Sequence, residues 1–268
     1  MQLQNKVVLV TGAGRGIGRA LCREAGRRGA AGIVVADLDG ALAQATAAEL
    51  GGLGLQCDVA DAAAVEAMVR AAESHYGRVD VLVSNAGFGA QALDLDDALS
   101  APDATWQRMW DVHVMAHARA CRAALPGMLA RGSGCLVNVA SAAGVLSQVG
   151  DTPYSVTKHA AVGLAESLAI TYGDRGIQVA VVCPQYVATA ITGLDESTAP
   201  GTLPGVLTVE QAAGAIADGI EAGGFLILTH PEVLGFFQRK AGDYDRWLAG
   251  MRRVRDSVRG GGFLKVKG

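Results

Sequence analysis

The residues best suited to chemistry are a serine, a tyrosine and a lysine that follow one another in a short stretch. Lys158 comes four positions after Tyr154, so the two side chains share one face if this stretch is helical. A phenol beside a fixed ammonium has its phenolate favoured, which lowers the tyrosine pKa from about 10 toward neutral pH. Such a tyrosine exchanges a proton with an alcohol, and Ser141 can hold the substrate oxygen by a hydrogen bond. The trio predicts acid–base chemistry on an alcohol or a ketone.

The elements that must position this trio follow from alternating apolar runs and helix-like segments. Residues 6–11 (KVVLVT) form a β-branched apolar run, typical of a strand buried on both faces. Six more strands are expected at 31–37, 53–57, 79–84, 134–139, 177–182 and 225–229. Helices are expected at 19–28, 42–50, 62–75, over roughly 25 residues ending near Arg131, and at 154–172. Unbroken alternation implies βαβ crossovers. We therefore predict a single-domain α/β fold with a doubly wound, mostly parallel seven-stranded sheet and helices on both faces.

A glycine-rich loop, Thr11 to Gly18 (TGAGRGIG), joins the first strand to the first helix. Glycines let the backbone turn sharply and approach a ligand closely, while the free N–H groups of the helix N-terminus attract a phosphate. Taken alone, such a loop is only a tight turn. Followed by a helix and a second strand, it predicts dinucleotide binding, with Gly12, Gly16, Ile17 and Gly18 as contacts.

Asp37 closes the second strand, nineteen residues after Gly18 (37 − 18). A carboxylate here accepts hydrogen bonds from an adenosine ribose and repels a 2′-phosphate. Arg15 is the opposing feature, because a guanidinium in the glycine-rich loop can reach a 2′-phosphate. We expect the carboxylate to dominate, so NAD is preferred over NADP, with Leu38 beside Asp37 as a further contact. Otherwise Asp37 is simply a turn residue.

Composition excludes several classes of function. The formal net charge of −3 and pI near 5.9 give no basic footprint for nucleic acid or anionic lipid. The start of the chain does not read as a signal peptide, and no apolar run of about 18 residues is present to span a membrane. The five cysteines are scattered without a C-x-x-C, which favours buried thiols over metal or disulfide roles. We expect a cytoplasmic protein with a small-molecule partner.

Five motifs in order resemble the short-chain dehydrogenase/reductase family. They are Thr11–Gly18, Asp58-Val59, Asn85-Ala86-Gly87, Ser141, and Tyr154 with Lys158. The resemblance covers about residues 5 to 230, and the spacing of thirteen positions from Ser141 to Tyr154 (154 − 141) is the one the family favours. It implies a Rossmann fold, hydride transfer with a nicotinamide cofactor, and a homodimer or homotetramer.

The resemblance also implies roles for individual residues. Asp58 and Val59 would contact adenine, and Asn85, Ala86 and Gly87 would form the turn beside the cofactor ribose. Lys158 would hold the nicotinamide ribose as well as lower the pKa of Tyr154. The carboxamide contacts would be Val187 and Thr189, unless these residues serve only in packing or capping.

Two positions depart from the family pattern. His113 stands where the family often has an asparagine that helps a water chain reach the lysine. It is either a satisfied structural histidine or part of a proton relay. The second departure is Gln185, which follows Pro184 where many relatives have glycine, and it brings an amide close to the nicotinamide. Neither change removes the serine, the tyrosine or the lysine.

The remaining segments bear on the substrate. We expect residues 1–230 to form the catalytic domain, residues 190–207 a substrate-covering loop within it, and residues 231–268 a C-terminal helical extension. The tail contains an amphipathic helix around Tyr244 to Val254. A mainly apolar pocket is expected, with substrate contacts from Val145, Gln148, Gln185 and Tyr186.

The function that these features predict is an NAD-dependent oxidoreductase that interconverts a hydrophobic secondary alcohol and its ketone. Alternatives are an NADP-dependent ketoreductase, a non-catalytic nucleotide-sensing regulator, a nucleotide-sugar epimerase or dehydratase, and a structural subunit. The intact trio argues against the regulator. The glycine spacing and the chain length of 268 residues argue against the epimerase.

Overall fold

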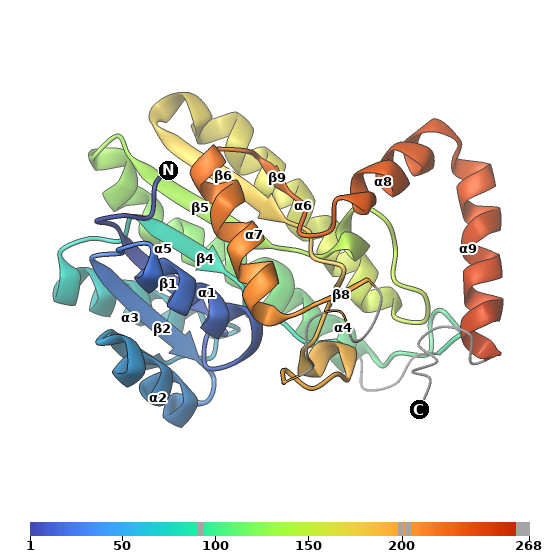
Figure 1. The fold of residues 1–268 in the computed structure, drawn as a ribbon, viewed down its shortest axis with the longest axis horizontal. Helices are drawn as coiled ribbons and strands as arrows, with labels where there is room; N and C mark the ends of the chain where they lie inside the picture. Colours follow the sequence, from blue (N-terminus) through green and yellow to red (C-terminus); the bar gives the residue numbers. More distant parts are fainter. Residues whose placement is uncertain (90–93, 198–200, 202–204, 261–268) are drawn as a thin grey trace.

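A sheet of seven parallel strands forms the centre of the molecule (Figure 1). The computed structural model describes residues 1–89, 94–197, 201 and 205–260. The strands are β1 (Val7–Thr11), β2 (Gly32–Asp37), β3 (Leu53–Gln56), β4 (Val81–Ser84), β5 (Gly134–Val139), β6 (Ile177–Val182) and β9 (Leu226–Ile227). Their order is β3-β2-β1-β4-β5-β6-β9, so the winding direction reverses between β1 and β4. The predicted doubly wound sheet is confirmed, and its carboxyl edge at this reversal is where such folds bind ligands.

Helices cover both faces of the sheet. They are α1 (Gly16–Arg27), α2 (Gly40–Leu50), α3 (Ala62–Tyr76), α4 (Asp103–Trp110), α5 (Ala116–Ala130), α6 (Thr152–Tyr172), α7 (Val209–Ala222), α8 (Glu232–Gly242) and α9 (Tyr244–Arg259). Alternate residues of each strand face opposite sides. Leu9 and Leu82 join a core under α3, α5 and α6. Val10 and Val83 join a second core under α1, α2 and α7. This two-sided burial explains the continuous apolar runs in the strands.

The helix predicted to end near Arg131 is interrupted. A π-helical turn at Asp111–Met115 separates α4 from α5 and carries His113. Such turns are single-turn departures from α-helical hydrogen bonding and are frequent at functional sites. Other predicted boundaries hold within a few residues, and Asp61 caps α3 by accepting from the N–H groups of Ala63 and Ala64.

The chain after β6 contains structure that the sequence patterns did not predict. Tyr186–Val187 (β7) pairs with Val206–Leu207 (β8) in a two-stranded parallel sheet that closes the base of the 190–207 loop. Helix α7 then crosses back over the central sheet (Figure 1). Residues 198–200 and 202–204 of the loop lie outside the described residues.

The tail forms two helices rather than one. The predicted amphipathic helix is α9, and α8 precedes it. In Figure 1 the pair stands to one side of the sheet, beyond the N-terminal end of α6. The division of the chain at residue 230 stays a prediction, and residues 261–268 lie outside the described residues.

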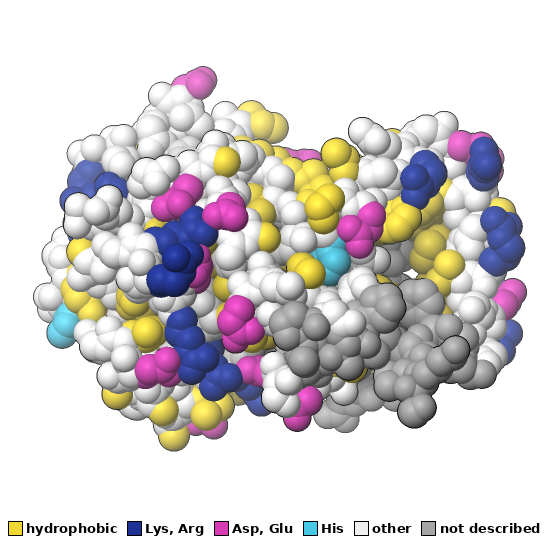
Figure 2. Space-filling model, in the orientation of Figure 1, with side chains coloured by type: hydrophobic (Ala, Val, Ile, Leu, Met, Phe, Trp, Pro, Cys, Tyr) yellow, Lys and Arg dark blue, Asp and Glu magenta, His cyan; other side chains and the backbone are white. Residues whose placement is uncertain are grey.

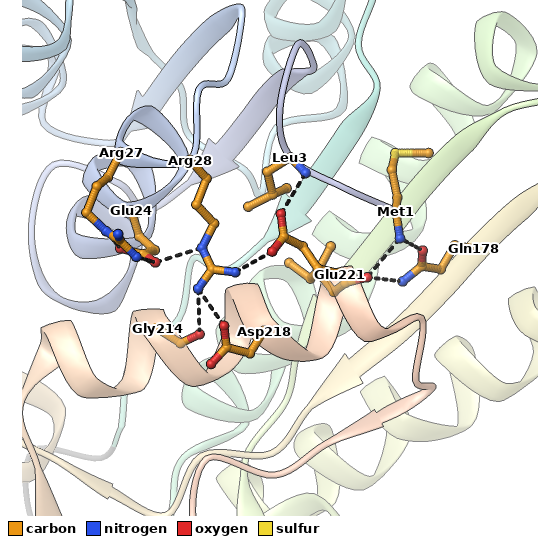
Figure 3. Close-up of polar contacts among 10 residues, drawn as sticks. Met1, Leu3, Glu24, Arg27, Arg28, Gln178, Gly214, Asp218 and Glu221 are labelled. Carbon is orange, nitrogen blue, oxygen red and sulfur yellow. Dashed lines mark hydrogen bonds and ion pairs between the residues drawn. The ribbon is translucent and has the colours of Figure 1, made fainter.

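The start of the chain is tied to α7 and β6 (Figure 3). The amino group of Met1 donates to Gln178 Oε1 and to the Ile220 carbonyl, the latter at 2.9 Å. The Leu3 N–H donates to Glu221 Oε1 at 3.0 Å. Figure 2 shows basic and acidic side chains interspersed over α1 and α7, so this face has no single-sign patch.

The described residues include no helix long and apolar enough to cross a membrane. All five cysteines are free and buried: Cys22, Cys57, Cys121, Cys135 and Cys183. Burial raises the pKa of each thiol, to about 11 for Cys57 and about 12 for the others. No metal-binding group of histidines, cysteines and carboxylates forms within the described ranges.

Candidate active site

The serine and the tyrosine of the predicted trio meet where β5 ends and α6 begins. Ser141 caps a 3-10 turn at residues 142–144, and its Oγ accepts from the Ala143 N–H at 3.1 Å. Asp151 caps α6 by accepting from the Tyr154 N–H at 3.1 Å, which fixes Tyr154 in the first helical turn. The Ser141 hydroxyl, which also donates to the Pro184 carbonyl at 3.4 Å, lies near the Tyr154 phenol and acts to lower its pKa. A substrate oxygen bound here would face two hydroxyl groups.

Lys158 lies one turn further along α6 and is buried. Its Nζ donates to the Val139 carbonyl at 3.1 Å and stands 5.6 Å from the centre of the Tyr154 ring. Burial lowers the pKa of Lys158 to about 8, because an ammonium is costly to keep away from water. The lysine is therefore mainly cationic at neutral pH, yet close to titration.

The pKa of Tyr154 differs from the sequence-based prediction. Burial raises it above its ordinary value, and this outweighs the lowering by the Ser141 hydrogen bond. The predicted lowering by Lys158 is not present in the protein chain alone, where the ammonium is committed to the Val139 carbonyl. Tyr154 is thus a neutral phenol in this structure, which is the form that donates a proton. The contact of Lys158 with a nicotinamide ribose stays a prediction.

His113 is fully buried beside this group, and both of its ring nitrogens are engaged. Nε2 accepts from the Phe88 N–H at 3.2 Å, so Nδ1 carries the proton and donates to Thr157 Oγ1 at 2.9 Å. Burial, then the charge of Lys158, lowers the pKa of His113 to about 2. Its ring packs edge-on against Tyr154, with centroids 5.6 Å apart. The geometry is that of a neutral histidine that positions the first turn of α6, and the relay role stays a prediction.

The glycine-rich loop is held by the turn after β4. Asn85 Nδ2 donates to the carbonyls of Thr11 and Gly12 at 2.9 and 3.1 Å. Thr11 Oγ1 accepts from the N–H groups of Asn85 and Ala86. Gly12 has a φ of +62°, and a Cβ there would lie 2.7 Å from Ala86 Cα, so no other residue fits. Gly87 follows, facing His113 and Lys158. The two predicted cofactor motifs therefore form one unit, alongside Ile17 and Gly18 in the first turn of α1.

Asp37 ends β2, and its contact with a ribose stays a prediction. Its Oδ2 accepts from the Gly14 N–H at 2.8 Å and its Oδ1 from the Asp39 N–H at 3.0 Å. Arg15, Asp37 and Leu38 line one open pocket together with Gln56. The Asp37 carboxylate, which favours NAD, and the Arg15 guanidinium, which favours NADP, thus line the same pocket. The exposed Leu38 offers an apolar surface beside them.

Asp58 makes polar contacts near the surface, whereas Val59 packs in the core. The carboxylate of Asp58 accepts from Arg108 NH2 at 3.2 and 3.3 Å and from the Ala60 N–H at 2.9 Å. Val59 is buried in the core. The adenine contacts of this pair stay predictions.

A residue missed by the sequence analysis occupies the N-terminus of α1. The Glu196 carboxylate accepts from the Gly16 N–H at 2.9 Å through Oε1 and from Arg19 NH2 at 2.7 Å through Oε2. A Cβ on Gly16, whose φ is +61°, would come no closer than 3.7 Å to Thr189 and 3.8 Å to Glu196. An anion thus sits at a helix N-terminus, the kind of position that attracts a phosphate, in a space that glycine leaves open. The residues present fit a dinucleotide cofactor.

The candidate substrate residues flank Ser141 and Tyr154. Val145 is buried and follows the 3-10 turn, and the Gln148 N–H donates to Ser155 Oγ at 2.8 Å. The Gln185 N–H donates to His230 Nδ1 at 3.2 Å, and His230 Nε2 donates to the Tyr186 carbonyl at 3.1 Å. His230 therefore shapes the segment after β6, a role that its position near the end of the apolar run 225–229 did not reveal.

The two predicted carboxamide contacts are held in place below the loop. Val187 is buried in β7, and Thr189 Oγ1 donates to the Val187 carbonyl at 3.3 Å. Thr189 also begins the 3-10 turn at 190–192 with a reciprocal cap to Thr192. In the sequence both residues lie between Tyr186, a predicted substrate contact, and Glu196, which contacts α1.

This fold and this arrangement of residues define a class of nicotinamide-dependent oxidoreductases. The family model described as short chain dehydrogenase matches residues 6–199, and the chain belongs to this family. The family resemblance drawn from the motifs is confirmed. Its members are dehydrogenases and reductases that act on CH–OH groups with NAD(P), and this chain is an enzyme of that kind.

Individual relatives span several substrates. The chain is 33% identical over 265 residues to oxidoreductase UcpA of Salmonella typhimurium, a match covering 95% of this chain and 94% of that one. It is 38% identical over 194 residues to 2-keto-3-deoxy-L-fuconate dehydrogenase of Xanthomonas campestris, covering 72% of this chain and 62% of that protein. A short chain dehydrogenase/reductase from Burkholderia phymatum was solved in complex with NAD. It superposes on this chain with a TM-score of 0.80 at 29% identity, and the match covers 91% of this chain and 96% of that one.

Proposed function

We propose that this enzyme interconverts a secondary alcohol and a ketone, with Tyr154 as the general acid and base. One observation carries the proposal: the half-buried phenol of Tyr154 lies close enough to the Ser141 side chain for that hydroxyl to lower its pKa, and the Lys158 ammonium lies 5.6 Å from the centre of its ring. Two hydroxyls and a cation at the carboxyl edge of the sheet suit a substrate oxygen that gains or loses a proton.

The proton steps follow from these positions. In ketone reduction, the neutral Tyr154 donates its phenolic proton to the carbonyl oxygen while Ser141 holds that oxygen. In alcohol oxidation, the phenolate accepts the hydroxyl proton as the carbon loses its hydride. The bound nicotinamide supplies the hydride chemistry. Lys158 remains cationic below a pH of about 8, so its charge is available to stabilise the phenolate as it forms at the reacting centre in either direction.

The cofactor is proposed to be NAD in preference to NADP. Asp37 supports this, because its carboxylate lines the pocket where a 2′-phosphate would have to enter. Gly12, Gly16, Ile17, Gly18 and the Asn85–Gly87 turn would hold the dinucleotide. Arg15 lines the same pocket and is the observation that favours NADP instead.

The substrate is proposed to be a hydrophobic secondary alcohol, with Val145, Gln148, Gln185 and Tyr186 around it. The buried apolar side chain of Val145 beside the Ser141 turn and the half-buried ring of Tyr186 support this. A relative from Lavandula x intermedia, 35% identical over 221 residues, is named borneol dehydrogenase, and borneol is a hydrophobic secondary alcohol. Another, D-threitol dehydrogenase of Mycolicibacterium smegmatis, is 36% identical over 199 residues and points to polyols.

The test is an alcohol and ketone panel that includes cyclic terpenoid alcohols, polyols and sugar acids. Each compound is assayed with NAD(H) and NADP(H) by absorbance of the reduced nicotinamide. Tyr154→Phe should lower turnover by about 100- to 10,000-fold, because the transferred proton is lost. Its dissociation constant for NADH, from fluorescence titration, should stay within about twofold of the wild-type value, because the glycine-rich loop is untouched.

Near-normal turnover by Tyr154→Phe would exclude Tyr154 as the proton donor. A preference for NADPH would overturn the argument from Asp37 and favour the ketoreductase alternative. NADH binding without turnover on any compound would favour a nucleotide-sensing or structural role.

We also propose that the enzyme works as a homo-oligomer in the cytoplasm. Val156 and Ile170 expose apolar side chains along α6, and Trp110 does so at the end of α4. Five buried free thiols suit a reducing compartment. Light scattering of the purified protein should give a dimer or a tetramer.

A further inference from the structure

Lys240, near the end of α8, is a buried lysine outside every motif discussed above. Only 6% of its surface is exposed, although it belongs to the C-terminal tail. Its Nζ donates to the carbonyls of Val145 and Leu146 at 2.9 and 2.8 Å. A third contact at 3.2 Å joins Nζ to Nε2 of His159. These three partners use all three N–H bonds of the ammonium.

The protonation of His159 follows from its other contact. Its Nδ1 lies 2.8 Å from the Ser155 carbonyl, so Nδ1 carries the proton and Nε2 offers a lone pair to Lys240. Burial lowers the pKa of His159, and the charge of Lys240 lowers it further, so the ring is neutral at neutral pH. Trp247 and Tyr244 of α9 place ring faces 5.0 and 5.6 Å from the same ammonium.

The partners of Lys240 belong to the two segments that carry the catalytic hydroxyls. Val145 and Leu146 end the turn that begins at Ser141, and the Leu146 N–H donates back to the Ala142 carbonyl at 2.8 Å. His159 directly follows Lys158 on α6. One ammonium therefore spans from the Ser141 turn to the helix of Tyr154 and Lys158.

We infer that Lys240 is a positioning residue that fixes Ser141 relative to Tyr154, and that the tail helices α8 and α9 serve to hold this ammonium in place. The inference rests on the proposed function, because it assigns importance to the distance between those two hydroxyls. Lys240 touches no reacting atom; it acts through the backbone of the Ser141 turn.

The first experiment does not depend on turnover. Hydrogen–deuterium exchange is followed in the full-length Lys240→Met variant, since methionine keeps most of the volume and loses the three donors. Amides of residues 142–149 should exchange at least about tenfold faster, while those of residues 12–18 should be unchanged. Arg239→Met is the matched control, because the neighbouring Arg239 is exposed and stacks on Phe236 instead. Unchanged exchange at 142–149 would overturn the inference whatever the activity.

The second experiment measures coupling to Ser141 with the best compound of the panel. Lys240→Met should lower kcat by about 10- to 100-fold with NADH affinity unchanged, because small misplacements of reacting groups are costly. In a Ser141→Ala background the same change should have little further effect, since both act through one hydroxyl. Lys240→Arg should recover part of the loss, because a guanidinium can still bond both carbonyls.

The outcomes separate the inference from the proposed function. Fully additive losses, or a normal kcat despite faster exchange, would show that Lys240 holds the turn without setting the position of the Ser141 hydroxyl. A wild-type protein with no turnover on any compound would refute the proposed function, and with it the positioning of a catalytic serine. The exchange data would in that case still decide whether Lys240 clamps the turn.

Discussion

Tyr154 is half-buried and Lys158 is buried, and the loss of contact with water acts on their pKa values in opposite directions. It raises the pKa of the phenol and lowers that of the ammonium, because each neutral form is easier to keep from water. The pair therefore rests as a neutral acid beside a cation that loses its proton near pH 8. This state is ready for ketone reduction, whereas alcohol oxidation first requires the phenol to lose its proton.

The pH dependence of the two directions should differ accordingly. For ketone reduction, kcat/KM should stay level below a pH of about 8 and fall above it, as Lys158 passes through its pKa and its positive charge is lost. For alcohol oxidation, kcat/KM should rise with pH over the same range, because the raised pKa of Tyr154 keeps the phenol protonated at neutral pH. Initial rates from pH 6 to about 10 test both profiles.

A matched measurement separates the effect of Lys158 on the proton step from its effect on cofactor binding. The affinity for NADH, titrated across the same pH range, shows how much of the fall in kcat/KM arises from weaker NADH binding. A reduction profile that stays level to pH 10 would contradict the assignment of the lower pKa to Lys158.

Spacing along the sequence was enough to predict Ser141, Tyr154 and Lys158, because two lie within one helical turn and the third ends a strand. The partners of Lys240 lie far from it in sequence, and Gly16 likewise lies far in sequence from its own partner, Glu196. No local pattern marks them. The contacts of His113 were equally hidden, since they depend on Phe88 and Thr157 meeting across the π-helical turn.

At the scale of elements, every expected strand was found because strands buried on both faces are continuous apolar runs. Helix α7 was missed although it carries a recognisable start, the reciprocal cap between Thr208 and Gln211. Half of its buried residues are alanines, which give a weak periodic signal. The π-helical turn was unpredictable because its residues are compatible with an ordinary helix.

The loop between β7 and β8 should compete with the cofactor. Its Glu196 carboxylate holds the Gly16 N–H and Arg19, which are donors suited to a phosphate. Glu196→Gln should therefore tighten NAD binding by about two- to fivefold, since a negative charge at the helix N-terminus no longer opposes the ligand. Isothermal titration calorimetry of the cofactor-free protein measures this directly.

Asp195→Asn is the control for that prediction, because it removes the same charge one residue away in an exposed position. A smaller change is expected for this variant. Weaker NAD binding by Glu196→Gln would mean that the carboxylate helps the cofactor rather than competing with it.

At the scale of the whole molecule, Arg28 joins the first helix to the seventh (Figure 3). Its guanidinium donates to Glu24, Asp218 and Glu221 at 2.6 to 2.7 Å, and its side chain is 14% exposed. Arg28→Met should lower the free energy of unfolding by about 1–2 kcal/mol, because three carboxylates lose a partner while Asp218 keeps its contact with water. Urea denaturation followed by circular dichroism tests this value.

Arg27→Met is the matched control. That side chain is 71% exposed and pairs with Glu24 on its own helix, so little change is expected. Acid titration adds a second check. Hydrogen bonds from Arg27, and then from Arg28, hold the pKa of Glu24 at about 2, below its usual value of 4.5. Stability from this carboxylate is complete above pH 4.5 and is lost as pH falls toward 2, so the difference between wild type and Arg28→Met should shrink over that range. A constant difference would contradict this role for Glu24.

The five sequestered thiols have a practical consequence. With every native sulfhydryl protonated and shielded, the folded enzyme should be inert to maleimides and other alkylating reagents. A single cysteine introduced at exposed Ile191 or Leu248 would then accept a fluorophore without prior removal of the natural ones. Movements of the loop or the tail can thus be followed by dye emission in an otherwise unaltered protein.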